Sequence, residues 1–168
     1  IHVQGSGATI GGSSPSARNV ISGNISAGIV IDGMGSSNNV IQGNYIGTNA
    51  SGDAAVPNPV GVYTQMATNT TIGGSGSGQG NVISGNSGEG ISLWDGTTGT
   101  TIEGNLVGVA ADAVTPLGNE GLGSYAYGGI VLRNYSYDNT IGGTGEGEGN
   151  VVANNSYGIV VFSGTQNR

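Results

Sequence analysis

The chain has 168 residues, including 36 glycines and no cysteine, and three arginines against ten acids give it a formal net charge of −7. This charge excludes an electrostatic fit to a nucleic-acid backbone, and the lack of cysteine excludes a metal–thiolate site. No apolar run approaches the roughly 20 residues that a membrane-spanning helix needs. The hydrophobic share of 35%, mostly regularly spaced Ile and Val, favours a folded, strand-rich protein over a disordered glycine-rich tract.

A six-residue motif, Asn-Val-Ile-Ser-Gly-Asn, recurs along the chain. It occupies residues 19–24 and 81–86, and an altered copy occupies residues 150–155. Each copy follows an Ile-Gly-Gly triplet and precedes a Gly-aliphatic-x-aliphatic run. Such self-similarity is typical of proteins built from stacked structural repeats.

The apolar positions fall into five groups of three, and each group predicts one coil with three short strands. In chain order the groups are centred on residues 10, 21 and 29; 41, 46 and 62; 72, 83 and 91; 102, 107 and 130; and 141, 152 and 159. The step from the first to the second member alternates between 11 and 5 residues. This predicts a three-sided solenoid whose long and short corners alternate from coil to coil, with strands of three to five residues.

Strands explain this pattern better than helices do. Period-2 alternation, as in Ile29-Val-Ile31, sends aliphatic side chains to one face of a strand, and the frequent glycines disfavour helix. Because no coil can bury its apolar side alone, stability is expected to come from stacking about fifteen interior aliphatics between neighbouring coils. We also expect one column of corner asparagines that hydrogen-bond between coils: Asn24, Asn44, Asn86, Asn105 and Asn155.

The Asn-x-Ile-x-Gly-Asn and Gly-Ile-x-Ile repeats resemble those of right-handed parallel β-helix proteins in the pectate-lyase-like superfamily. More narrowly, Asn-Val-Ile-Ser-Gly-Asn and Gly-Asn-Tyr-Ile-Gly-Thr are similar to repeats of large prokaryotic surface and secreted proteins. The resemblance implies an all-β fold, a right-handed single-stranded parallel β-helix of about five coils with residues 1–168 as one domain. It also implies an extracellular or cell-surface location. The architecture hosts lyases, hydrolases, tailspikes, adhesins and inert stalks, so the activity must be argued from side chains.

Polysaccharide lyases and hydrolases of this superfamily work through clustered carboxylates, often with calcium. In the expected register, the outward rows of the first two sides contain no two adjacent carboxylates, and Glu103 stands alone. Glycoside hydrolysis normally uses a pair of carboxyl groups. His2, the single histidine, lies beside the terminus, and no Ser-His-Asp set can be assembled around it. No catalytic residue is therefore predicted.

The third side carries the chemically richest row. Trp94, Arg133 and Phe162 are predicted to lie on consecutive coils, close enough for the arginine to stack on an aromatic face. Asp95 and Asn134 follow two of these residues. Four tyrosines flank one strand of this side: Tyr125, Tyr127, Tyr135 and Tyr137. Two interpretations remain open, because these side chains either pack the long loop 108–128 onto the solenoid wall or recognise a sugar or another subunit.

Two long corners, residues 48–59 and 109–128, are predicted to emerge from the same edge two coils apart. Oxygen-bearing side chains in the second one suit a calcium ion: Asp112, Asn119 and Glu120. The corner lacks a regular Asp-x-Asp-x-Asp spacing, so surface acids without a metal are the alternative interpretation. No other cofactor is predicted.

The two ends of the chain resemble open solenoid ends, which expose unpaired strand edges. Asn167-Arg168 followed by residues 1–5 resembles a strand such as residues 39–43. We therefore expect either a segment of a longer solenoid or a unit that stacks head to tail. The expected partners are copies of itself or flanking solenoid segments.

Two functions fit these expectations. The first is a non-catalytic extracellular structural solenoid that forms a stalk, fibre or surface layer. The alternative is a polysaccharide-binding or polysaccharide-degrading protein, lyase-like or hydrolase-like, that uses the third side and has an extracellular polysaccharide as its partner.

Overall fold

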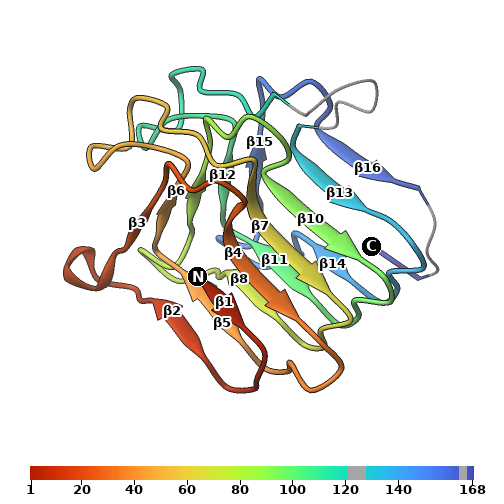
Figure 1. Cartoon of the computed structure of the whole chain (residues 1–168). Coiled ribbons are helices and arrows are strands. Elements are labelled where there is room, and N and C mark those ends of the chain that lie inside the picture. The colour runs from red at the N-terminus through yellow and green to blue at the C-terminus, as the bar shows by residue number, and fades with distance from the viewer. Residues whose placement is uncertain (121–127, 163–165) are drawn as a thin grey trace.

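The computed structural model describes residues 1–120, 128–162 and 166–168 as a parallel β-helix with three sheets (Figure 1). Sheet A contains, in order, β1 (His2–Val3), β4 (Ala27–Asp32), β7 (Val60–Gln65), β10 (Ile91–Trp94), β13 (Ile130–Leu132) and β16 (Ile159–Val161). Sheet B contains β2 (Thr9–Gly11), β5 (Val40–Gln42), β8 (Thr71–Gly73), β11 (Thr101–Glu103) and β14 (Thr140–Ile141). Sheet C contains β3 (Val20–Ile21), β6 (Tyr45–Ile46), β9 (Val82–Ile83), β12 (Leu106–Val107) and β15 (Val151–Val152).

The predicted register is confirmed in every sheet. The first apolar column, in sheet B, joins Ile10, Ile41, Ile72, Ile102 and Ile141. The second, in sheet C, joins Ile21, Ile46, Ile83, Val107 and Val152. The third, in sheet A, joins Ile29, Val62, Ile91, Ile130 and Ile159. These columns line the interior, and their members in the middle coils are fully buried.

The strands of sheet C are shorter than predicted, with two residues each. In coils 1 and 3, counted from the N-terminus, a positive-φ glycine such as Gly23 (φ 70°) lies one residue beyond the end of the strand and turns the chain. Asn154 (φ 60°) takes this place in coil 5. A helical turn that the pattern did not predict, η1 (Pro15–Ala17), lies between β2 and β3. Within the described ranges, no helical segment has the length and apolar character that a bilayer crossing requires.

The alternation of corners is also as predicted. We call the link from sheet B to sheet C the first corner and the link from sheet C to sheet A the second corner. Coils 1, 3 and 5, the odd coils, have long first corners at residues 12–19, 74–81 and 142–150. Coils 2 and 4, the even coils, have short first corners at residues 43–44 and 104–105 and long second corners that begin at residues 47 and 108.

Two asparagine ladders, rather than one, run along the solenoid. The first-corner ladder joins Asn19, Asn44, Asn81, Asn105 and Asn150. The second-corner ladder joins Asn24, Asn58, Asn86, Asn119 and Asn155. The prediction that Asn24, Asn44, Asn86, Asn105 and Asn155 share one column is therefore wrong. Asn44 and Asn105 belong to the first-corner ladder, whereas Asn24, Asn86 and Asn155 belong to the second-corner ladder.

Each rung of a ladder uses the asparagine amide in the same direction. The backbone N–H and Nδ2 of Asn44 both donate to Oδ1 of Asn81, at 3.0 and 3.1 Å. Nδ2 of Asn81 donates back to the carbonyl oxygen of Ile41 at 2.8 Å. Because Asn44 and Asn81 are fully buried, these amides satisfy backbone groups that water does not reach.

The corner between sheets A and B carries a third column, which is interrupted. Asn139 donates through its backbone N–H and its Nδ2 to Oδ1 of Asn167, as in the two ladders. Thr70 and Thr100 take the equivalent place in the middle coils. Their buried Oγ1 atoms have no hydrogen-bond partner among the described residues. Threonine thus leaves polar atoms unsatisfied where asparagine reaches the next coil.

Completing this column is expected to stabilise the protein. The double variant Thr70→Asn/Thr100→Asn should raise the free energy of unfolding by about 2 kcal/mol, because the new amides pair with Asn39, Asn139 and each other. Urea denaturation followed by circular dichroism measures the change. Thr71→Asn, at the partly exposed strand position next to the column, is the control and should give no gain. A double variant no more stable than the parent would contradict this account.

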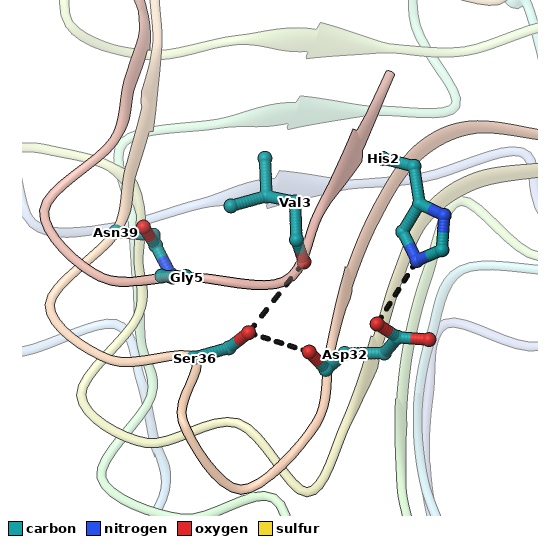
Figure 2. A network of polar contacts seen from close by, with 6 residues as sticks. All are labelled: His2, Val3, Gly5, Asp32, Ser36 and Asn39. Atoms are coloured by element: carbon teal, nitrogen blue, oxygen red, sulfur yellow. Dashed lines mark hydrogen bonds and ion pairs between the residues drawn. The ribbon is translucent and has the colours of Figure 1, made fainter.

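Strand β1 forms the N-terminal edge of sheet A. The terminal ammonium of Ile1 donates to the carbonyl oxygen of Gly28 at 2.8 Å. Figure 2 shows the neighbouring contact, in which Nε2 of His2 lies 2.9 Å from Oδ1 of Asp32. In the same view, Oγ of Ser36 bridges the carbonyl oxygens of Val3 and Asp32. The hydrogen bond with His2 lowers the pKa of Asp32. These contacts hold β1 in register against β4.

The two ends of the chain lie on different sides of the solenoid. Ile1 leads into sheet A, whereas Arg168 extends sheet B: its N–H donates to the carbonyl oxygen of Asn139, and its own carbonyl oxygen accepts the N–H of Ile141. Joining Arg168 to Ile1 would move β1 from sheet A to sheet B. The resemblance of Asn167-Arg168 plus residues 1–5 to the strand at residues 39–43 is not matched in the structure, because β1 lies in sheet A and β5 lies in sheet B.

Candidate functional site

The outer side of sheet A carries the predicted row of polar and aromatic residues. Asp32, Gln65 and Trp94 are neighbours in the strand register. Arg133 and Phe162 continue the row directly after β13 and β16. The prediction that Trp94, Arg133 and Phe162 lie on consecutive coils is confirmed.

Arg133 is held between its two aromatic neighbours. Its guanidinium carbon lies 5.0 Å from the ring centroid of Trp94 and 5.5 Å from that of Phe162. Its Nη2 pairs with Oε1 of Glu89, and the two charged side chains are only 17% and 14% exposed. Burial lowers the pKa of the Arg133 guanidinium. We call Glu89, Trp94, Arg133 and Phe162 the arginine clamp, which connects coils 3, 4 and 5.

Removing one charge of the arginine clamp is expected to destabilise the protein. Arg133→Gln leaves Glu89 mostly buried without its cation, and we expect a loss of about 2–3 kcal/mol in the free energy of unfolding. The double variant Glu89→Gln/Arg133→Gln should lose less than the sum of the two single changes, as urea denaturation of all four proteins would measure. Arg18→Gln is the control, because Arg18 stacks on Tyr45 at 4.1 Å without a carboxylate partner among the described residues. Additive losses would contradict a coupled pair.

Asp95 and Asn134 are brought together at the turns that follow sheet A. Asp95 accepts a hydrogen bond from Nδ2 of Asn134 through Oδ1 at 2.9 Å, and one from Nε2 of Gln65 through Oδ2 at 2.5 Å. Asp95 and Asn134 both have positive φ, of 46° and 51°. Their polar side chains therefore tie successive turns to one another on this side of the solenoid.

Of the four predicted tyrosines, the structure describes Tyr135 and Tyr137. Tyr135 is 80% exposed, and Tyr137 forms a β-bridge with Thr98. Tyr125 and Tyr127 lie outside the described residues. Tyr63, which sequence reasoning missed, is tilted 46° against Trp94, with ring centroids 6.2 Å apart. Its outward position beside the buried Val62 is the signal that would have identified it.

An open hollow lies beside Tyr63 on the outer side of sheet A. It has a volume of 470 Å³ and is lined by Ile25, Ser26, Ala27, Val30, Pro59, Val60 and Tyr63. Ile25 is fully exposed there. Burial, followed by the nearby carboxylates Asp95 and Asp32, raises the pKa of Tyr63. The lining of the hollow is mainly apolar, whereas the ring of Trp94 is in contact with Arg133.

Two of the three residues predicted as calcium ligands, Asp112 and Asn119, serve separate structural roles. Oδ1 of Asp112 accepts the N–H groups of Val114 and Thr115, so this side chain caps its own turn. Asn119 is fully buried in the second-corner ladder, where its Oδ1 accepts from Asn86. Glu120 is exposed. The part of the chain that the structure describes contains no group of three His, Cys, Asp or Glu residues able to hold a metal ion.

Glu103 has a carboxylate neighbour that the strand register does not reveal. Glu148, from the long first corner of coil 5, lines the same hollow of 460 Å³ together with Thr144 and Arg168. The backbone N–H of Gly145 holds Oε2 of Glu148 at 2.6 Å. Burial and then repulsion from Glu148 raise the pKa of Glu103. The expectation that Glu103 stands alone holds along the strand rows but is wrong for the corner.

The raised pKa of Glu103 makes its contribution to stability depend on pH. The contribution is complete below the unfolded pKa of about 4.5 and is lost as the pH rises through the higher folded value. Glu103→Gln should therefore leave stability unchanged near pH 3 and raise it at pH 7, by less than about 1 kcal/mol because Glu103 is partly exposed. Urea midpoints at both pH values test this. Glu146→Gln, an exposed acid of the same corner, is the control for removing one charge, and an equal gain from it would contradict the assignment.

Comparison of the chain with protein-family models, with curated proteins and with solved structures gave no match.

Proposed function

We propose that the chain is a non-catalytic structural segment of an extracellular β-solenoid that builds a stalk, fibre or surface layer. The observation that carries the proposal is the pair of asparagine ladders, whose rungs connect each coil to the next from Asn19 to Asn150 and from Asn24 to Asn155. Satisfied buried amides of this kind make a stiff and specific core. The resemblance to repeats of prokaryotic surface proteins supports the proposed location.

The residues of the candidate site support the same proposal. The arginine clamp uses its charges and rings between coils, and Asp95 is engaged by Gln65 and Asn134. Asn119 belongs to a ladder. These side chains strengthen the long axis of the solenoid, which is the direction in which a stalk or fibre bears load.

The test combines location with activity. Immunogold labelling of the cells that make the protein is expected to place it on thin projections or in a layer at the cell surface. Incubation of the purified chain with pectin, alginate and neutral glycans is expected to release no unsaturated products and no new reducing ends. Label confined to the cytoplasm, or depolymerisation of any of these glycans, would contradict the proposal.

Polysaccharide binding at the hollow beside Tyr63 is the second candidate. It is favoured by one observation, the apolar and aromatic lining of an open hollow of 470 Å³. Sugar rings stack on such aromatic faces, whereas the ring of Trp94 already contacts Arg133. A glycan array should then show binding that is lost in Tyr63→Ala and kept in Tyr45→Ala, a partly exposed tyrosine of sheet C. No binding by the parent protein would remove this candidate.

A further inference from the structure

Five Asn-x-Ser/Thr sequences occur in the chain, and this sequence is the acceptor signature of N-linked glycosylation. A site of this kind needs a side-chain amide at the surface and a hydroxyl two residues later, which the transferase recognises. The five asparagines are Asn24, Asn49, Asn69, Asn134 and Asn154. The structure separates them by the contacts that their Nδ2 atoms make.

Four of the five asparagines use Nδ2 to hold the corners of the solenoid in place. In chain order, omitting Asn69, Nδ2 donates to Oδ1 of Asn58, Oδ1 of Asp53, Oδ1 of Asp95 and the carbonyl oxygen of Gly108. A sugar attached to any of these nitrogen atoms would have to share the space of the acceptor that the nitrogen now contacts. The folded protein therefore disfavours a glycan at these four positions.

Asn69 differs from the other four. It is exposed, and its side-chain amide makes no hydrogen bond within the described residues. Its Oδ1 lies over Gly99 of the next coil, where an added Cβ would come within 2.4 Å of that oxygen. The oxygen end of the amide is thus packed against the neighbouring turn, and Nδ2 is the end that remains available for modification.

The corner between sheets A and B also leaves space around Asn69. At the first and second corners, long corners from coils two apart already meet. The N–H of Ala111 donates to the carbonyl oxygen of Gly52 at 2.9 Å. A Cβ on Gly78 would lie 2.2 Å from the carbonyl oxygen of Ser13. These long corners fill the space beside the short corner between them, so two of them on adjacent coils would compete for one place.

The links from sheet A to sheet B are short in every coil from the first to the fourth. They comprise residues 33–39, 66–70, 95–100 and 133–139. Asn69 lies in the shortest of these links, and its φ of 52° belongs to a tight turn. A branched sugar at this turn would extend away from the sheets without meeting a long corner.

The same corner contains the unsatisfied polar atoms of the core. Thr70, the middle residue of the acceptor sequence, is fully buried, and its Oγ1 has no hydrogen-bond partner among the described residues. Oγ1 of Thr100, one coil later, is in the same condition. Because unsatisfied buried groups weaken a segment, this turn is expected to open locally more readily than the asparagine ladders. Local opening would present Asn69 and the hydroxyl of Thr71 to a transferase together.

We propose that Asn69 is an N-glycosylation site and that Thr71 supplies its hydroxyl. The co-substrate is an oligosaccharide joined through pyrophosphate to a membrane lipid. The bond between C1 of the first sugar and the pyrophosphate oxygen breaks, and a bond between C1 and Nδ2 of Asn69 forms. One Nδ2 proton passes to a base of the transferase, and the lipid pyrophosphate leaves. The inference rests on the extracellular location in the proposed function, because such glycans are carried by secreted proteins.

The test compares three proteins recovered from the surface of the source cells: the parent, Thr71→Val and Thr71→Ser. Thr71→Val removes the hydroxyl at a partly exposed strand position whose neighbour in register is Val40, so the fold is expected to be kept. Thr71→Ser keeps a hydroxyl and is the matched control. Chymotrypsin releases residues 64–94, which contain no other Asn-x-Ser/Thr sequence. Electron-transfer fragmentation, which leaves the sugar on its side chain, then locates the modified residue.

The parent and Thr71→Ser are expected to carry the glycan at Asn69, whereas Thr71→Val should lose at least about nine-tenths of it. Equal urea midpoints of the deglycosylated proteins would show that this loss does not come from misfolding. Equal occupancy at the four other asparagines would overturn the selection of Asn69 by its free amide, and a glycan retained in Thr71→Val would overturn the role of Thr71.

The result also separates this site from the proposed function. An unmodified Asn69 in protein recovered from the cell surface would overturn the glycosylation site and leave the structural proposal standing. Recovery of the protein from the cytoplasm alone, with Asn69 unmodified, would overturn both.

Discussion

Replacing Gly73 by alanine is expected to destabilise the protein strongly, whereas the same change at Gly33 is expected to be mild. Both glycines have a φ of 92°, so both substitutions carry the backbone cost of an L-residue in this region, about 1–2 kcal/mol. At Gly33 an added Cβ meets nothing within 4 Å. At Gly73 it would lie 1.9 Å from the carbonyl oxygen of Glu103, which is backbone of the adjacent strand β11.

The clash at Gly73 cannot be relieved by turning a side chain, because the obstructing atom belongs to the paired backbone of sheet B. We expect Gly73→Ala to cost about 4 kcal/mol or more in total, once strand displacement is added to the backbone term. Urea denaturation of both variants, with hydrogen exchange of the Ile72 and Ile102 amides, measures the difference. If Gly73→Ala and Gly33→Ala lowered the free energy of unfolding equally, the close approach of Gly73 to strand β11 would not contribute to stability.

Replacing Asn86 by alanine is expected to have the second-largest effect. The Asn86 side chain donates to the carbonyl oxygen of Ile46 and to Oδ1 of Asn119, and its Oδ1 accepts both the N–H and the Nδ2 of Asn58. Asn86→Ala leaves the donors of Asn58 unsatisfied in a fully buried position. We expect a loss of about 3–4 kcal/mol in the free energy of unfolding, measured by urea denaturation.

Asn24→Ala is the matched control for Asn86→Ala. Asn24 belongs to the same ladder but is exposed, and its side chain makes one rung bond, to Oδ1 of Asn58 at 2.7 Å. Its loss should cost about 1 kcal/mol or less. If Asn24→Ala lowered the free energy of unfolding as much as Asn86→Ala, the ladder would stabilise the protein through local turn geometry and not through buried contacts between coils.

The arrangement of coils was predictable because it depends on residues that repeat. Isoleucine and valine recur at each interior position, so the columns through Ile72, Ile83 and Ile91 follow from spacing alone. The asparagine ladders were assigned incorrectly for a physical reason. Gly43-Asn44 and Gly23-Asn24 have the same two residues and similar turn geometry, yet they lie at different corners of the triangle.

Contacts made by corner residues were harder to predict than those made by strands. Trp94 and Arg133 were placed together from strand register, but Glu89 completes the arginine clamp from a corner 44 residues away in sequence. Glu148 likewise reaches Glu103 only because the long corner of coil 5 folds back over the sheet. Strand periodicity predicts positions within a sheet, whereas the path of an irregular corner depends on backbone contacts that no spacing records.

The alternation of long and short corners has a consequence for how genes encoding such proteins can change. Deleting a single coil of about thirty residues would bring two long corners of one type side by side, whereas loss or duplication of a coil pair preserves the order. Ile10 and Ile72 are 62 residues apart and mark one such pair. Viable length variants among natural relatives should therefore differ by even numbers of coils. A pair of coils, and not a single coil, is then the segment that duplication or deletion of the gene can add or remove.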